Sequence, residues 1–328
     1  MWTKLSPMTS VNPTNPTDRG NESKAAPISP IDRIVGVLKL GTPTTSLNHT
    51  YVKGESLYFP TGRVYGGQVI AQSVVAAART VEESRLPESI HGLFITAGDI
   101  GQDILFDVES LRDGHSFSSR RVNATQKDGA IFTAISNFQE KGQSGFRYED
   151  PMPDDLPEPQ SLPSMYDLMS PYQKQSSFAD YYTNQSPFDI RHITSVVLMH
   201  REKDEQARQD RQMVWLKADG HVEADQVIHR ALLALGCDQF MMEPIIRRSG
   251  YSFLVPGISF ASLDHSMWWY EDIDMNDWLL FMQETPKAAH SRGLSQAKVY
   301  DRSGRLVAAM VQEAMVRIPG EYLSERTD

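Results

Sequence analysis

The spacing of apolar residues changes along the chain. From Asp225 to Arg248, apolar residues recur every three or four positions, which predicts one long helix with an apolar stripe. The stretch from Arg63 to Val81 has the same spacing and is rich in alanine, and it predicts a second long helix, entered through Gly66 and Gly67. Between the two helices, residues 88–139 alternate with a period of two, which predicts antiparallel strands.

The elements occur in a similar order in the two halves of the chain, which predicts a repeated unit. A short amphipathic helix after Ser29-Pro30 and a strand pair within Thr45–Tyr58, broken near Gly54, precede the first long helix. The strands expected in the first half are Ser89–Ala97, Asp103–Arg112, Ser116–Gln126 and Ala130–Gln139. Those expected in the second half are Ile190–Leu198, Gln212–Ala218, Ile258–Trp269, Trp278–Glu284, Ser291–Asp301 and Arg305–Val316.

Two predicted hairpin turns coincide when the halves are overlaid with a shift of 175 residues, and this overlay places Asn137 on Gln312. A shift that is one residue smaller places His91 on His265. The region between the halves is rich in proline, serine and glutamine, which is typical of a connecting segment. We therefore expect five regions: a disordered arm at 1–30, a unit at 31–140, a linker or lid at 141–187, a unit at 188–318 and a tail at 319–328.

Composition narrows the class of protein. The chain has 328 residues, 40% of them hydrophobic, and a formal net charge of −10, so we expect a soluble globular protein that does not bind nucleic acid. The single cysteine, Cys237, excludes a disulfide within the chain. We find no run of about 18 apolar residues and no secretory leader, and we expect an intracellular protein without a membrane span.

Several kinds of catalytic motif are absent from the sequence. The string nearest to GxSxG, at 114–118, lacks the final glycine, so a hydrolase with a serine nucleophile is not favoured. There is no GxGxxG, no P-loop and no His or Cys cluster with metal-ligand spacing, and we therefore expect no cofactor and no metal. Cys237 could act as a nucleophile, but a lone cysteine on an apolar helix more often packs in the core.

Three polar residues interrupt apolar segments of the second half. Asp238 lies on the stripe of the long helix, Ser262 in the strand before Asp264, and Gln312 in the last strand. Together they could hold a water molecule and take its proton as it attacks a carbonyl carbon. The periodicity alone favours another interpretation, in which these residues, with His265, satisfy one another in the core.

The glycine pair at the start of the first long helix also has two interpretations. The free N–H groups of Gly66 and Gly67 could bind an oxyanion or a phosphate at the helix start. Two adjacent glycines are, however, more often part of a tight turn.

Four segments resemble the type II acyl-CoA thioesterases, the TesB-like family. They are RVYGGQVIAQ at 63–72, LRDGHSFSSRRVNATQ at 111–126, PGISFASLDHSMWW at 256–269 and LVAAMVQEAMVR at 306–317. The resemblance covers roughly 31–317. It implies an α+β double hotdog fold, in which two long helices are each wrapped by an antiparallel sheet and the sheets join side by side. It also implies hydrolysis of acyl-CoA to a carboxylic acid and coenzyme A without a covalent intermediate.

The resemblance also implies roles for individual residues. In this family an Asp on the second long helix, a Thr or Ser before DHSMW and a Gln in the VQE strand position the attacking water, and these positions are Asp238, Ser262 and Gln312 here. Bacterial members tend to carry Thr where this chain has Ser262, so the hydroxyl is kept. Gly66, Gly67 and His265 are candidate substrate-binding residues.

Family analogy further predicts a homo-oligomer acting in fatty acid or secondary metabolism, in the peroxisome or cytoplasm, although the C-terminus lacks an SKL-type signal. Two alternative functions remain open. One is a hotdog hydratase or dehydratase using His91 or His265 in an acid/base pair. The other is an acyl-CoA-binding module without catalytic activity.

Overall fold

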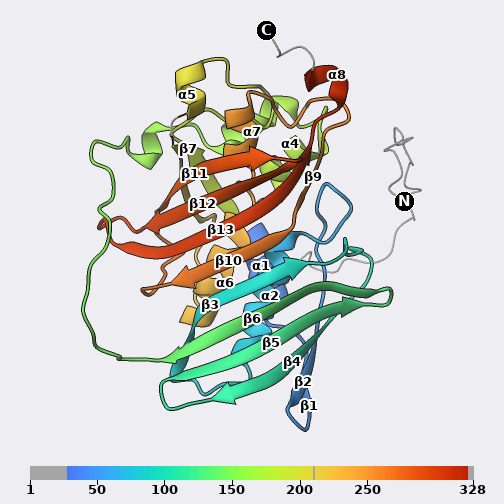
Figure 1. Cartoon of the computed structure of the whole chain (residues 1–328), viewed down its shortest axis with the longest axis vertical. Coiled ribbons are helices and arrows are strands. Elements are labelled where there is room, and N and C mark those ends of the chain that lie inside the picture. The colour runs from blue at the N-terminus through green and yellow to red at the C-terminus, as the bar shows by residue number, and fades with distance from the viewer. Residues whose placement is uncertain (1–27, 210, 324–328) are drawn as a thin grey trace, which may run out of the picture.

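Antiparallel strands from both halves of the chain form one continuous sheet in the computed structural model, which describes residues 28–209 and 211–323 (Figure 1). Within these residues the sheet has thirteen strands, in the order β1-β2-β4-β5-β6-β3-β10-β13-β12-β11-β8-β7, with β9 beside β13. The strands of the first half are β1 (Thr44–Ser46), β2 (His49–Gly54), β3 (Arg85–Phe94), β4 (Ile104–Asp113), β5 (Phe117–Gln126) and β6 (Gly129–Glu140). Those of the second half are β7 (Phe188–His192), β8 (Gln212–Ala218), β9 (Ser259–Ser262), β10 (Asp264–Trp269), β11 (Leu279–Ala289), β12 (Arg292–Tyr300) and β13 (Leu306–Arg317).

The two halves meet where β3 pairs antiparallel with β10. The register places His91 opposite Ser266 and Gly92 opposite His265. This pairing leaves no free sheet edge between the halves, because the backbone groups of both strands bond across it. The expected α+β class, with two sheets joined side by side, is therefore confirmed.

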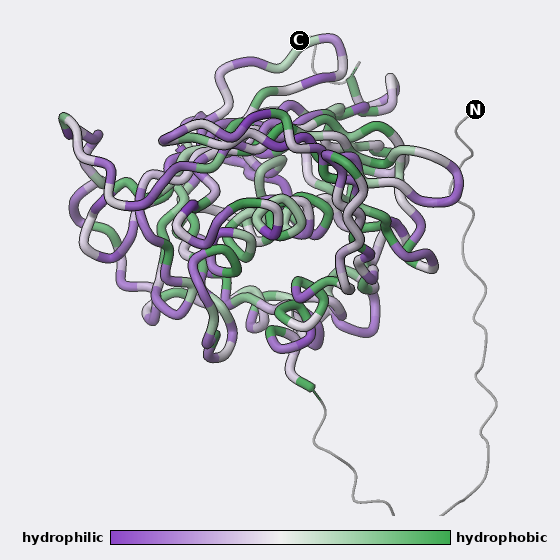
Figure 2. Tube along the Cα trace, turned by 90° about the horizontal axis from the view of Figure 1, so that it is seen from below, coloured by the Kyte–Doolittle hydropathy of each residue, from purple (hydrophilic) through white to green (hydrophobic). Residues whose placement is uncertain are grey.

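The main helices lie on one face of this sheet. They are α1 (Pro30–Leu38), α2 (Gly66–Ala78), α6 (Gln226–Cys237) and α7 (Glu243–Ser249). Helix α2 packs against α6, and the turned view shows helical coils within the arch of strands (Figure 2). Residues Gly67 to Ala77 of α2 are all buried. Small side chains suit that position, because they let α2 approach α6 and the sheet closely.

The second long helix was expected to run unbroken from Asp225 to Arg248, and this prediction is wrong. Helix α6 ends at Cys237, turns follow from Asp238 to Met242, and α7 begins at Glu243. Pro244 explains the break, because proline has no N–H to donate to the carbonyl four residues earlier. That carbonyl, on Phe240, instead accepts from the Glu243 N–H at 3.1 Å and from the Gln283 side chain at 3.3 Å. Asp238 is consequently the C-cap of α6 rather than a mid-helix residue.

The segment 141–187 carries two short helices, α3 (Met165–Met169) and α4 (Ser177–Asn184), as well as 3₁₀ turns, η1 (Pro159–Ser161) and η2 (Ser170–Tyr172). Helices this short show too few turns for a periodic signal, although Ser164 and Ser176 cap them.

The earlier part of the segment 141–187 covers the outer sheet face of the second half. There Met152, Leu156 and Leu162 pack on a cluster of large side chains: Trp215, Trp278, Leu280, Met282 and Tyr300. The segment thus completes a second core cluster.

Two expected strands end earlier than their apolar patterns suggested. β7 stops at His192, whereas a strand was expected to continue to Leu198. The strand pair within Thr45–Tyr58 turns at Leu47, whose φ is 54°, rather than near Gly54, which ends β2. The expected arm at 1–30 lies almost wholly outside the described residues.

The overlay of the two halves is wrong by one residue. Gln312 is fully buried, whereas Asn137 is only partly buried and bonds to the Ser119 side chain. His91 packs its ring edge-on against Trp268, on the sheet face opposite to the buried His265. A slip of one residue inverts the face of every side chain in a strand.

Correcting this slip places Ser136 on Gln312 and its strand partner Ile90 on His265. All four residues are buried. The first half therefore has a serine and an isoleucine where the second half has a glutamine and a histidine.

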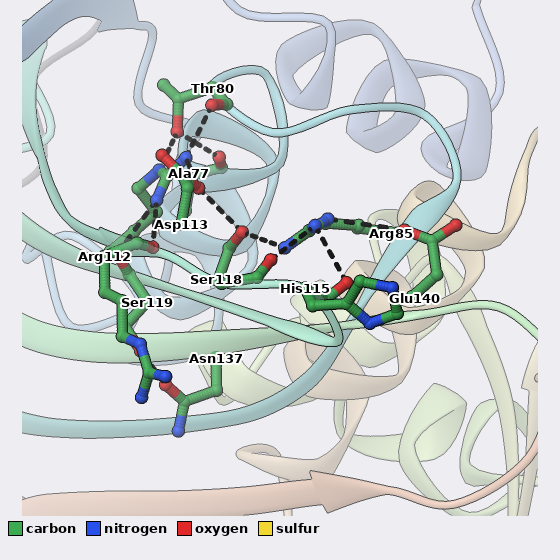
Figure 3. Close-up of polar contacts among 12 residues, drawn as sticks. Ala77, Thr80, Arg85, Arg112, Asp113, His115, Ser118, Ser119, Asn137 and Glu140 are labelled. Atoms are coloured by element: carbon green, nitrogen blue, oxygen red, sulfur yellow. Dashed lines mark hydrogen bonds and ion pairs between the residues drawn. The ribbon is translucent and has the colours of Figure 1, made fainter. Parts of the chain in front are cut away.

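A buried arginine fastens the β4–β5 hairpin to the end of α2. Arg120 is 2% exposed, and its guanidinium donates to the side chain and carbonyl of Thr80, to Asp113 and to the carbonyls of Arg112 and Ser119. Asp113 is also bonded by Ser118, which in turn accepts from Arg85 (Figure 3). Many polar residues of the 111–126 motif therefore have a structural role, because they take part in this hydrogen-bond network.

We expect Arg120→Ala to lower the free energy of unfolding by about 2–3 kcal/mol, because buried carbonyl groups would lose their donor. The matched control is Arg121→Ala on the opposite strand face. The Arg121 side chain is 46% exposed and pairs with Glu109, so the loss should stay below about 1 kcal/mol. Equal losses in a urea titration of the two variants would contradict a structural role specific to Arg120.

Candidate active site

The carboxylate of Asp238 lies at the meeting point of both halves of the molecule. Asp238 is 7% exposed, and its Oδ2 accepts from the backbone N–H of Gly67 at 2.8 Å. Its Oδ1 lies 3.2 Å from Nε2 of Gln312 and 3.4 Å from the Ser262 hydroxyl. The three residues expected to act together are therefore brought together, and a donor from the first half joins them.

The surroundings of Asp238 raise the pKa of its carboxyl group above the ordinary value of 3.8, chiefly because burial disfavours the charged form. The nearby His265 and the hydrogen bonds from Gly67, Gln312 and Ser262 partly oppose this shift. The position at the C-terminus of α6 also disfavours an anion, whereas the N-terminus of α2 favours it. The result is a carboxylate that is more basic than an exposed one, yet held by three donors.

A β-bulge between β9 and β10 directs Ser262 and His265 to the same side. Ser262 pairs with Ala314 on β13, while Ser266 pairs with Val311, so the register shifts by one residue between them. The Asp264 carboxylate accepts the Glu313 N–H at 2.8 Å in the bulge. Without the bulge, residues three positions apart would face opposite sides of the sheet.

Gln312 links the carboxylate to His265. Its Nε2 donates to the Ser262 hydroxyl at 2.8 Å, and its Oε1 lies 2.8 Å from Nδ1 of His265. Nε2 of His265 faces the Cys237 thiol at 3.7 Å. Burial lowers the pKa of His265, which favours the neutral ring, and both ring nitrogens face protein groups.

The glycine pair at the start of α2 allows the close approach of α2 and α6. A Cβ on Gly67 would lie 2.5 Å from the Leu235 carbonyl, and one on Gly66 would lie 2.8 Å from Asp238 Oδ2. The Tyr65 hydroxyl donates to the same Leu235 carbonyl at 2.8 Å. Gly66 and Gly67 are thus both next to the carboxylate. The Tyr65 contact was missed by sequence reasoning, because it depends on a helix 170 residues away.

Not every predicted residue joins this group. His91 lies on the outer sheet face, where its Nδ1 is 3.1 Å from the Ser266 hydroxyl. Cys237 is buried, and burial raises the pKa of its thiol well above the ordinary value, which is unfavourable for a nucleophile. Its hydrogen bond to the Ala234 carbonyl agrees with core packing.

One cavity lies in the second half of the molecule, and another lies where the first half, the segment 141–187 and α6 meet. A cleft of about 300 Å³ between α7 and β11 includes Arg208, Arg211, Arg247 and Arg248, but none of the residues that bond Asp238. A smaller one of about 30 Å³ is bounded by Phe59, Tyr65, Tyr181 and Leu235, and therefore adjoins the glycine pair. Phe59 stacks on Tyr65 with ring centres 4.5 Å apart. We consider the smaller cavity more relevant to the site, because Tyr65 directly precedes Gly66.

Within residues 28–209 and 211–323, no group of three or more His, Cys, Asp or Glu is placed to hold a metal ion. In the same residues, no helix is both long and apolar enough to cross a membrane.

Comparison with known proteins identifies the family. The model of the acyl-CoA thioesterase N-terminal domain matches residues 56–139, and that of the C-terminal domain matches residues 151–316. The chain belongs to the acyl-CoA thioesterase family. Acyl-coenzyme A thioesterase 8 of Mus musculus is 30% identical over 282 residues, which cover 83% of this chain and 86% of that protein.

Similar proteins are also found among solved structures. Acyl-CoA thioesterase II TesB2 from Mycobacterium marinum is 29% identical with a TM-score of 0.68, covering 88% of this chain and 99% of that one. A hot dog fold protein from Alicyclobacillus acidocaldarius covers 88% of this chain and 98% of its own, with a TM-score of 0.67 at 16% identity, which bears on the fold alone. The expected double hotdog fold and the expected enzyme class, an acyl-CoA thioester hydrolase, are confirmed.

We expect Gly67→Ala to lower the free energy of unfolding by about 1–3 kcal/mol, because the added Cβ would collide with a backbone carbonyl of α6. The matched control is Gly36→Ala in α1, where an added Cβ meets nothing within 4 Å. That change should raise stability by roughly 0.5–1 kcal/mol through helix propensity. Shifts of the same sign in thermal unfolding would contradict the close contact between α2 and α6.

Proposed function

We propose that this chain hydrolyses acyl-CoA thioesters by direct attack of a water molecule that Asp238 deprotonates and that Gln312 and Ser262 position. The observation that supports the proposal is the convergence of a buried carboxylate, a carboxamide and a hydroxyl within 3.4 Å of one another. Carboxylate and carboxamide groups at this spacing can together hold one water and accept its proton.

The reaction balances without a cofactor. The water oxygen bonds to the thioester carbonyl carbon while its proton passes to Asp238, and the carbonyl becomes an oxyanion. When the tetrahedral intermediate collapses, the carbon–sulfur bond breaks with its electron pair on sulfur. The proton held by Asp238 then passes to the departing thiolate, which gives coenzyme A and a free acid. The raised pKa of Asp238 suits a group that accepts the proton of water and later returns it.

We assign the Gly66 N–H to the oxyanion. Gly66 is the first residue of α2, so its N–H has no acceptor within the helix. The next N–H, on Gly67, is already donated to Asp238. Backbone donors at a helix start stabilise negative charge that develops next to them. The N–H of Gly67, which was expected to bind substrate, is therefore assigned to the general base Asp238 instead.

The alternative functions gain no support from these contacts. A hydratase or dehydratase would need His91 or His265 as an acid or base facing the substrate. His91 lies on the outer sheet face, and both nitrogens of His265 face Gln312 and Cys237. A silent acyl-CoA-binding module would have no need for a buried carboxylate with a raised pKa. The homo-oligomer and the peroxisomal or cytoplasmic location stay predictions.

We expect Asp238→Asn to lower kcat for acyl-CoA hydrolysis by about 100- to 10,000-fold, because the general base is lost. Ser262→Ala should cost about 10- to 100-fold, and Ser262→Thr, which keeps the hydroxyl, should recover most of that loss. The measurement is the release of free thiol from a series of acyl-CoAs, acetyl to palmitoyl, at matched protein concentration.

The control is Asp128→Asn in the exposed turn between β5 and β6, which should leave kcat unchanged. Thermal unfolding of each variant separates loss of activity from loss of fold. Wild-type turnover by folded Asp238→Asn would refute the assignment of the base.

A further inference from the structure

The orientation of the Gln312 carboxamide matters for the proposed reaction. A carboxamide has a donating end and an accepting end, and the two are close in size. Only with Nε2 toward the carboxylate can Gln312 donate to Asp238 and to Ser262, as it does at 3.2 Å and 2.8 Å. The opposite orientation would turn a carbonyl oxygen toward an anion.

The negative charge of Asp238 can fix this orientation by itself, but only while the carboxylate is ionised. Once Asp238 has taken the proton of water, its O–H can donate, and a carbonyl oxygen becomes an acceptable partner for it. A rotated Gln312 could then no longer help hold the carboxyl group and the next water. Some second contact is needed to hold the carboxamide through this step of the reaction.

His265 is placed to supply that contact. Its Nδ1 lies 2.8 Å from Oε1 of Gln312, and a carbonyl oxygen can only accept, so Nδ1 carries the hydrogen. The other ring nitrogen lies 3.7 Å from the sulfur of Cys237, whose thiol hydrogen is donated to the Ala234 carbonyl. His265 is 1% exposed and Gln312 is fully buried, so the contact is protected from water.

We propose that His265 is a positioning residue, whose Nδ1–H holds Oε1 of Gln312 and thereby keeps Nε2 directed at Asp238 and Ser262. The proposal rests on the proposed function and extends it, because it replaces the expected substrate contact of His265 with an action through Gln312. The bulge at Asp264 serves this arrangement, since it brings His265 and Ser262 to the same side of the sheet.

The first half of the molecule offers a comparison on the same fold. Its equivalent strand pair carries Ile90 opposite Ser136, and the Ser136 hydroxyl donates to the Ser89 carbonyl instead of to a carboxylate. The first half thus has no histidine at the equivalent strand position, and no carboxamide there to orient.

The test compares three substitutions of His265 that differ in where they can donate. In asparagine the amide nitrogen is bonded to Cγ, as Nδ1 is, whereas in glutamine it lies one bond farther out, as Nε2 does. We expect His265→Leu and His265→Gln to lower kcat by roughly 10- to 100-fold with little change in KM. His265→Asn should recover most of the loss. His91→Leu on the outer face of β3 is the matched control and should leave kcat unchanged.

A double-mutant cycle tests whether His265 acts through Gln312. In a Gln312→Ala background, His265→Leu should change kcat by less than about threefold, because the group that it orients is gone. Thermal unfolding of every variant shows whether the loss of the ring has only destabilised the core.

Two results would overturn the proposal. The first is a wild-type kcat in folded His265→Leu. The second is that His265→Asn and His265→Leu lower kcat equally, and that this loss multiplies with the loss caused by Gln312→Ala in the double mutant. Either leaves the proposed function intact if the wild type hydrolyses acyl-CoA. A wild type without thioester hydrolysis would instead contradict the proposed function, and the positioning role with it.

Discussion

A buried carboxylate must be given donors, and the donors of Asp238 come from both halves of the chain. Gly67 reaches it from the start of α2, and Gln312 and Ser262 reach it from β13 and β9. Removing these donors would leave a charge in a medium that solvates it poorly, at a cost of several kcal/mol. The site therefore depends on the pairing of β3 with β10, which holds the halves together.

The two halves share an architecture but differ in chemistry. Helix α2 carries no acidic residue, and the inward strand pair of the first half is Ile90 and Ser136. The second half has Asp238 at its helix end and the His265–Gln312 pair on its strands. The first half contributes glycines instead, whose lack of side chains lets α2 come within hydrogen-bond distance of the carboxylate. One half supplies the reactive groups, and the other completes their surroundings.

The sequence predicted the class of fold and the convergence of Asp238, Ser262 and Gln312, because period-two strands and family motifs are local signals. It did not predict the helix break after Asp238, since the apolar spacing continues past Pro244 and hides the effect of that proline. The bulge at Asp264 was equally hidden, because alternation within a strand cannot show a one-residue register shift against its partner. The bond from Gly67 to Asp238 joins residues 171 positions apart, and only the packing of α2 on α6 creates it.

The central claim, that Asp238 activates water and does not itself attack the thioester, is tested most directly by a single turnover in ¹⁸O-labelled water with enzyme in excess over acyl-CoA. Direct attack predicts one ¹⁸O atom in the carboxylic acid product and none in the peptide that contains Asp238. If the Asp238 carboxylate attacked first, a mixed anhydride would form. Attack of water on the Asp238 carbon of that anhydride would leave ¹⁸O in Asp238 and unlabelled oxygen in the product. Label in Asp238 after one turnover would contradict the account.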